Sequence, residues 1–292
     1  MIKRSLGGWS FDIFNVCFMF LIVVITLYPL WYILMASISD SLSLTQHQGL
    51  ILKPLGFSLN AYKLVFRNPM IPTGFLNTLF IVIVGTVINI ILTSMSAYVL
   101  SRKKLMLKGI LLFMCTFTMI FSGGLIPFYL QVRSLGLMGN RFAIILPTAI
   151  STFNLIILRT AFAGLPDSLE ESAKIDGAND FTIFGRIMVP LAMPSIAVII
   201  LYCAVGHWNG WFNAMLFMTE RSMYPLQLIL REILVNNATD SMLTSVSGGD
   251  KEMISESIKY TTIIVATVPV LVVYPFLQRY FVKGVMIGAL KG

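Results

Sequence analysis

The chain has 292 residues, of which 57% are apolar and 12% are charged, and its formal net charge is +8. Soluble domains carry about 25% charged residues, so this composition excludes an ordinary soluble protein. We interpret the excess of Lys and Arg as the bias that orients membrane spans, and not as a nucleic-acid-binding surface. The composition therefore predicts an integral membrane protein that contacts lipid and binds no nucleic acid.

The first apolar stretch follows Lys3 and Arg4, as in a secretory signal peptide. It is longer than the usual 7–15 apolar residues of such a signal, and no A-x-A-like cleavage site follows it. We therefore expect a retained first span.

Six stretches without charged residues each have room for the roughly 20 residues that cross a hydrocarbon core as a helix. Lipid admits only helices and closed barrels, and these stretches are too long and too uniform for barrel strands. The predicted fold class is all-α, with one transmembrane domain over residues 1–292. Its six helices are expected near residues 13–36, 76–100, 109–131, 142–162, 191–217 and 261–280.

The orientation of these spans follows from the basic residues. The tight cluster Arg102–Lys108 lies between the second and third spans and indicates a cytoplasmic turn. An even number of spans then places both termini and the segment 165–190 in the cytoplasm. The long loop 220–259 faces outward, where it is either a contact for another protein or a plain linker.

Few residues suggest chemistry. Cys17, Cys115 and Cys203 lie singly within predicted spans, which indicates packing and no disulfide or metal site. The chain lacks a phosphate-binding G-x-x-x-x-G-K-[ST] loop and any H-E-x-x-H or Ser-His-Asp arrangement. We expect no catalysis, no metal and no cofactor bound by this chain. A secondary transporter or channel is the alternative class, but it favours charges or a filter sequence within the spans.

Polar and aromatic residues within the spans are candidates for a substrate path. Amides can bind sugar hydroxyls and aromatic faces can contact sugar C–H groups. Packing between helices and interfacial Trp are the alternative explanation. The candidates are Asn77, Asn89, Asn154, Trp208, Asn209, Trp211 and Asn213.

The segment Leu165–Pro194 contains five of the thirteen carboxylates, although no Asp or Glu occurs between Asp40 and Asp167. Such a segment favours water over lipid. Asp167 or Ser168 is expected to cap a short helix, with Glu170 or Glu171 as the return partner of a capping box.

Gly177 is expected to end this first helix in a left-handed conformation. Asn179 or Asp180 should cap a second short helix over residues 181–188, with Phe181 and Phe184 seating it. The small Ala173 and Gly177 would let a partner protein approach the backbone closely.

The spacing within this segment resembles the EAA loop of bacterial ABC-importer permeases, whose pattern is E-A-A, x3, G, x9, I, x, L, P. The matching positions are Glu171, Ser172, Ala173, Gly177, Ile187, Val189 and Pro190. Ser172 replaces the first Ala of the pattern and Val189 replaces its Leu. Both replacements conserve size.

Other stretches resemble carbohydrate-uptake permeases such as the six-span subunit type of the maltose transporter. They are residues 75–78, 208–209, 224–227 and 280–286. Residues 123–127 and the tail 288–292 are most similar to the YtcP/LplC-like group of complex-oligosaccharide permeases. The resemblance implies the MetI-like fold of type I ABC importers.

The resemblance also implies partners and a role. The partners would be a second, related permease, two cytoplasmic ATPase subunits that hold ATP and Mg, and an extracytoplasmic solute-binding protein. The chain would sit in the bacterial cytoplasmic membrane and import sugars, with oligosaccharides as the expected cargo, by ATP-driven alternating access. Glycerol phosphate or another small solute is the alternative cargo. The residues that would couple it to the ATPase are Glu170, Glu171, Ser172, Ala173, Asp176, Gly177, Phe181, Phe184, Ile187 and Pro190.

Overall fold

The computed structural model describes residues 6–103, 105–235 and 255–272. Within these ranges the chain forms helices and connecting loops, and its only β structure is an isolated antiparallel bridge between Ser39 and Phe57. The predicted all-α class is therefore confirmed. The chain divides into two compact units, Met1–Pro69 with Glu232–Val268 and Met70–Arg231 with Pro269–Gly292.

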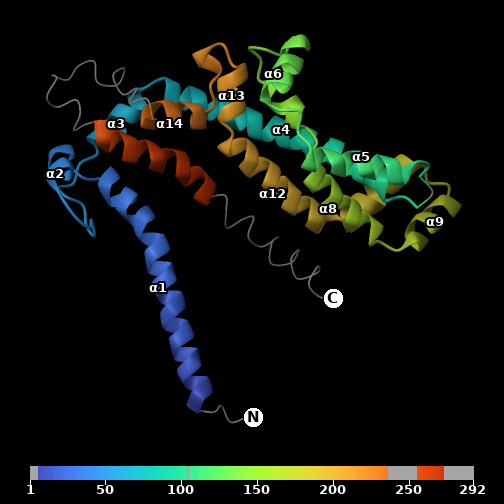
Figure 1. Cartoon of the computed structure of the whole chain (residues 1–292), viewed down its shortest axis with the longest axis horizontal. Coiled ribbons are helices and arrows are strands. Elements are labelled where there is room, and N and C mark those ends of the chain that lie inside the picture. The colour runs from blue at the N-terminus through green and yellow to red at the C-terminus, as the bar shows by residue number, and fades with distance from the viewer. Residues whose placement is uncertain (1–5, 104, 236–254, 273–292) are drawn as a thin grey trace. The chain divides into compact units, whose positions relative to one another are not determined.

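The first unit contains α1 (Leu6–Ser37), α2 (Ser41–Gln46), α3 (Asn60–Arg67) and most of a helix over Ser255–Val272 (Figure 1). The apolar side chains of α1 are exposed over most of its length, as expected of a helix that faces lipid. Near its end, Met35 and Ala36 pack with Leu44 and Ile51 in a small buried cluster.

The second unit is built around α4 (Met70–Ser101), along which α8 (Thr152–Ala163) and α12 (Met193–Asn209) pack (Figure 1). The buried positions of α4 include small or polar residues, which allow helices to approach closely in a membrane. The other helices of this unit include α5 (Lys108–Ile120), α6 (Leu125–Ser134), α7 (Phe142–Ile145), η1 (Leu146–Thr148), α13 (Phe212–Phe217), η3 (Arg221–Met223) and the first part of α14 (Leu226–Val235).

Among the described residues, three helices are long and apolar enough to be membrane spans, and the number rises to six if each of three bent helix pairs is one span. Three are single helices, namely Trp9–Ser37, Met70–Ser101 and Ser255–Val272. The other three are pairs of helices joined at a bend: 116° between α5 and α6, 50° between Phe142–Thr148 and α8, and 82° between Asp180–Leu191 and α12. Each of these segments overlaps one of the six predicted spans, and in the last pair it is α12 that overlaps the predicted fifth span, whereas nearly all of Asp180–Leu191 precedes it.

The prediction of uninterrupted helices over 109–131, 142–162 and 191–217 is wrong. The first is broken at residues 121–124, where Gly124 adopts a φ of 89° that few other residues tolerate. The second is broken at residues 149–151, between η1 and α8, and the third at Gly210-Trp211 between α12 and α13. Within the predicted outer loop 220–259 the structure contains η3 and α14. The rest of that loop up to residue 254, the predicted end of the sixth helix (273–280) and the motif residues 280–292 lie outside the described residues.

Candidate functional site

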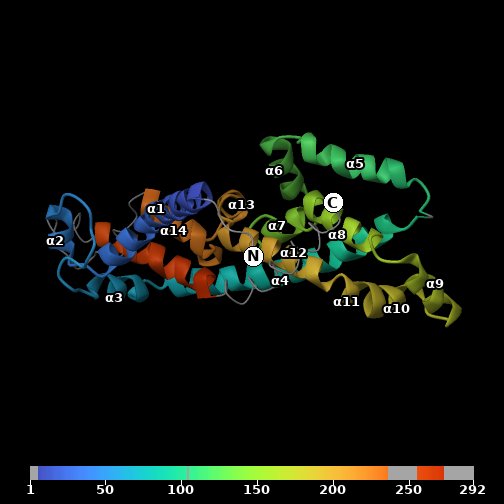
Figure 2. The same cartoon turned by 90° about the horizontal axis from the view of Figure 1, so that it is seen from below.

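The acidic segment forms a small helical projection, here called the knob (residues 165–191), at one end of the second unit. It contains α9 (Asp167–Ile175), α10 (Asp180–Thr182), the π-helical turn η2 (Ile183–Met188) and α11 (Val189–Leu191). Figure 2 shows α9 at the far end of the unit, with α10 and α11 leading back toward α12. The second predicted short helix is thus a longer helical run, Asp180–Leu191.

The predicted capping box at the start of α9 is wrong. Pro166 occupies the N-cap position, and no side chain makes a capping hydrogen bond there. Asp167 and Glu170 instead bind basic side chains outside α9. The carboxylates of Asp167 and Glu170 therefore form ion pairs and do not cap the backbone amides of α9.

The end of α9 follows the prediction for Gly177, whose φ is +78°. The amide of Gly177 donates to the carbonyl of Lys174 (3.1 Å), and that of Ala178 to the carbonyl of Ala173 (2.9 Å). This pair of hydrogen bonds is a Schellman motif, which closes a helix with a left-handed residue. A Cβ at Gly177 would meet no atom within 4 Å, so the backbone conformation, and not lack of space, favours glycine.

The second helical run begins at the predicted cap. The side chain of Asn179 accepts a hydrogen bond from the amide of Thr182 (2.8 Å). Further along, the amide of Val189 donates to the carbonyl of Phe184, five residues earlier, as in a π-helix. Such turns are rare and occur often at functional sites.

An apolar seat holds the knob against the helical bundle. Ala173, Ile183 and Met188 are buried in a cluster that includes residues of α4, α8 and α12. The ring of Phe184 lies 5.2 Å from that of Tyr98 on α4. The knob is therefore packed onto the bundle and is not a free loop.

Two predicted roles change. Phe181 is 76% exposed and does not seat the second helix, whereas Phe184 does. Ala173 is only 8% exposed, so its small side chain allows close packing within this chain and leaves no approach for a partner.

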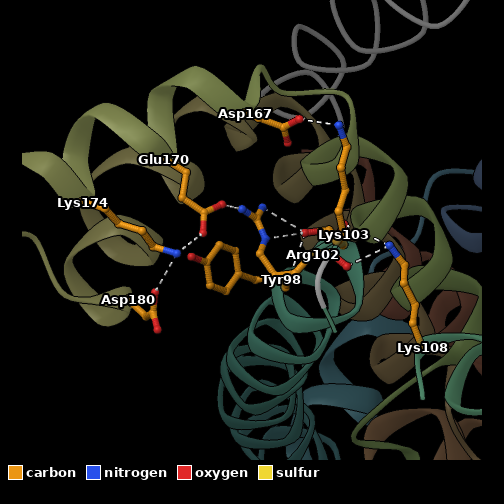
Figure 3. A network of polar contacts seen from close by, with 9 residues as sticks. Tyr98, Arg102, Lys103, Lys108, Asp167, Glu170, Lys174 and Asp180 are labelled. Atoms are coloured by element: carbon orange, nitrogen blue, oxygen red, sulfur yellow. Dashed lines mark hydrogen bonds and ion pairs between the residues drawn. The ribbon is translucent and has the colours of Figure 1, made fainter. Parts of the chain in front are cut away.

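The end of α4 binds the knob through charged groups (Figure 3). Arg102 forms an ion pair with Glu170, and its guanidinium lies 4.4 Å from the centre of the Tyr98 ring. Glu170 also accepts a hydrogen bond from Lys174 (2.9 Å), and Lys174 lies 3.7 Å from Asp180. The side chains of Arg102 and Glu170 are only 22% and 15% exposed, so solvent screens this pair less than a surface pair.

A second pair joins Lys103 to Asp167 in the open, with side chains that are 78% and 55% exposed. The hydrogen bond from Lys103 lowers the pKa of Asp167, and the same contact raises the pKa of Lys103. Lys108 donates to the carbonyl of Arg102 (2.9 Å), which is one of the unpaired carbonyls after the end of α4. The basic cluster that predicted orientation thus also holds the knob, a role that sequence analysis missed.

The outward surface of the knob is both acidic and apolar. Of the predicted coupling residues, Glu171, Ser172, Asp176, Gly177 and Pro190 are exposed and Ile187 is half-buried. Beside them, Ile175 is 86% exposed, an apolar position that sequence analysis did not select. Exposed apolar residues close to carboxylates offer a surface that another protein can cover.

The second candidate site is a hollow of about 590 Å³ bounded by α8, α12 and α13. Among the described residues that line it, amide and aromatic side chains occur and Asp, Glu, Lys and Arg do not. The lining residues are Asn89, Ile144, Thr148, Ser151, Phe153, Asn154, Tyr202, Cys203, Gly206, His207, Asn209, Gly210, Trp211, Phe212 and Asn213. Five of the seven predicted path residues therefore meet at one cavity.

Asn89 links three helical segments at the edge of the hollow. Its Nδ2 donates to the carbonyls of Thr148 (2.8 Å) and Ala149 (3.1 Å), which lie at the bend before α8. Its Oδ1 accepts from Nε2 of His207 on α12 at 2.8 Å. This side chain therefore supplies the hydrogen bonds that the bend leaves open.

The other two predicted path residues, Asn77 and Trp208, do not line the hollow. Asn77 donates to the carbonyls of Ser222 (2.8 Å) and Tyr224 (3.1 Å) and accepts from Arg141 (2.8 Å). Trp208 is buried, with its ring 6.0 Å from that of Phe75. Both residues hold helices and loops together.

Comparison with known proteins agrees with this architecture. Residues 89–287 match the family described as "Binding-protein-dependent transport system inner membrane component". The polygalacturonan/rhamnogalacturonan transport system permease protein YtcP of Bacillus subtilis is 41% identical over 97% of this chain and 98% of its own length. Protein LplC of the same organism is 41% identical over 100% of this chain and 98% of its own.

A solved structure is similar over almost the whole chain. It is the crystal structure of a bacterial ABC transporter involved in the import of the acidic polysaccharide alginate. The matched chain has 33% sequence identity and a TM-score of 0.88, and the match covers 96% of this chain and 100% of that one. With its knob, bent spans and near full-length relatives, this chain belongs to the family of binding-protein-dependent transport system inner membrane components.

Proposed function

We propose that this chain is the permease subunit of an ABC importer that takes up oligosaccharides by ATP-driven alternating access. The observation that carries the proposal is the knob, a rigid projection with EAA spacing that is closed by a Schellman motif and packed onto the bundle enclosing the hollow. A projection of this kind can pass a rigid-body displacement to the helices that hold it.

The partners follow from this role. The exposed carboxylates and the apolar side chains of Ile175 and Phe181 form the surface for one of two ATPase subunits, which bind ATP and Mg and carry out hydrolysis. A second, related permease completes the path, and a solute-binding protein delivers the sugar from outside.

The hollow supports sugar as the cargo. Its volume of about 590 Å³ lies within the usual range for ligand sites, and its amide and aromatic walls match hydroxyls and C–H faces. The transport roles of YtcP and of the alginate importer also favour oligosaccharides over glycerol phosphate.

We propose that the knob faces the cytoplasm, so that both termini are cytoplasmic too. The Arg102–Glu170 pair joins the knob to the basic turn after α4, which supports a location of both on the same side of the membrane. Excess Lys and Arg favour the cytoplasmic side.

The test uses Gly177→Trp, with Gly136→Trp as the matched control, because both glycines have a positive φ (+78° and +68°) and a Cβ at either meets nothing within 4 Å. Both permease subunits, the ATPase and the binding protein are reconstituted in liposomes. We expect the control to bind the ATPase and import oligosaccharide but not glycerol phosphate, whereas Gly177→Trp inserts normally and fails to bind the ATPase. Unchanged ATPase capture by Gly177→Trp would refute the coupling role, and import of glycerol phosphate alone would refute the cargo.

A further inference from the structure

We propose that Arg102 is a positioning residue that transmits displacement of the knob to α4, and through α4 to the hollow. This inference rests on the proposed function, since it assumes that an ATPase moves the knob. It concerns an ion pair within this chain, and Arg102 lies outside the segment with EAA spacing.

The first step is the shape of α4. It runs as one helix from Met70 to Ser101, and none of the three bends described above lies in it. Asn89 lies 12 residues before Ser101, which corresponds to about 18 Å along the helix axis. A push on the end of α4 therefore reaches Asn89 through a continuous hydrogen-bonded rod.

The second step is the contact at the knob end. The guanidinium of Arg102 is held by Glu170, by the ring of Tyr98 at 4.4 Å and by Oγ of Ser101 at 3.0 and 3.2 Å (Figure 3). Apolar contacts such as those of Ile183 are non-directional and permit sliding. A partly shielded ion pair with a planar guanidinium is directional, so it fixes the register between α9 and α4.

The third step is the contact at the hollow. Asn89 donates to the carbonyls of Thr148 and Ala149 at the 50° bend and accepts from His207 on α12. Movement of α4 must therefore move or break these bonds, which changes the wall of the cavity. Helix α4 thus connects the knob, through Arg102, with the hollow, through Asn89.

If Arg102 only stabilised the knob, its replacement would lower ATPase binding and transport together. The test therefore measures ATPase binding and transport separately. The variants are Arg102→Gln, Arg102→Lys and the exchange Arg102→Glu with Glu170→Arg. The matched control is Lys103→Gln, which removes the same charge from the neighbouring residue and breaks only the exposed pair with Asp167. ATPase capture, ATP hydrolysis stimulated by the binding protein, and sugar imported per ATP are measured in liposomes.

We expect Arg102→Gln to capture the ATPase as the wild type does and to hydrolyse ATP, but to import about tenfold less sugar per ATP, a typical size for coupling between sites. Arg102→Lys and the exchange should recover part of that ratio, and Lys103→Gln should keep it. An unchanged ratio in Arg102→Gln, or a loss of import in proportion to ATPase capture, would overturn the inference. Failure of the wild type to capture the ATPase would overturn the proposed function, and the inference with it.

Discussion

Gly85 of α4 provides the space in which His207 meets Asn89, so the change Gly85→Ala tests the packing beside the hollow. A Cβ at this glycine would lie 2.6 Å from Nε2, 2.9 Å from Cε1 and 3.0 Å from Cδ2 of His207. The ring therefore has to move, and the 2.8 Å hydrogen bond to Asn89 is lost with it.

The expected free-energy change is a sum of opposing contributions. Overpacking costs about 1–3 kcal/mol. Loss of the hydrogen bond costs about 0.5–1.5 kcal/mol. Alanine in place of glycine within a helix offsets about 1 kcal/mol of this. Gly85→Ala should therefore destabilise the permease by about 0.5–3.5 kcal/mol. The control Gly206→Ala on α12 meets no atom within 4 Å, so it should be neutral or stabilising.

The measurement is thermal unfolding of the purified permease for both variants, and for Gly85→Ala in a His207→Ala background. Removal of the ring removes the clash, so Gly85→Ala should no longer destabilise there, as a double-mutant cycle would reveal. Equal shifts in the midpoint for Gly85→Ala and Gly206→Ala would refute the reasoning, because only the first has a ring in its way.

Two further predictions concern the knob. Phe184→Ala should destabilise it by about 2–4 kcal/mol, since the ring packs on Tyr98, whereas Phe181→Ala should spare stability and weaken ATPase binding; thermal unfolding and ATPase capture distinguish them. The contact with Lys103 lowers the pKa of Asp167 from its ordinary 3.8, and the contact with Asp167 raises the pKa of Lys103 from its ordinary 10.5. Both groups are therefore charged, and the contact is present, at every pH between 3.8 and 10.5. It should thus be lost as pH falls through the lowered pKa of Asp167, and the stability difference between wild type and Asp167→Asn should stay constant from about pH 5 to about pH 9. A change in that difference within the window would contradict the assignment.

Apolar stretches predicted the six span candidates because a charged residue in lipid costs much free energy, and this cost affects only the span that contains the residue. The bends were missed because hydropathy measures transfer to lipid and ignores backbone geometry. Ser122-Gly123-Gly124 carried a turn signal, and it marks the 116° bend. The bend at Ala192 depends on tertiary packing as well as on the prolines that flank it.

The knob was predictable where its structure is local. Gly177 and Asn179 act on neighbouring backbone groups, so sequence alone indicated their roles. The ion pair of Glu170 depends on Arg102, 68 positions earlier in the chain. The burial of Ala173 depends on residues of α4, α8 and α12 that pack around it. Such contacts between distant segments are not encoded in any short window of sequence.

The two hydrogen bonds that close α9 also constrain how this segment can change in length. One residue added between Ala173 and Asn179 would turn everything beyond it by about 100° about the helix axis. Phe184 would then leave its place beside Tyr98, and the exposed side chain of Ile175 would face another direction. Insertions and deletions should therefore be tolerated far less in this stretch than substitutions of its exposed side chains.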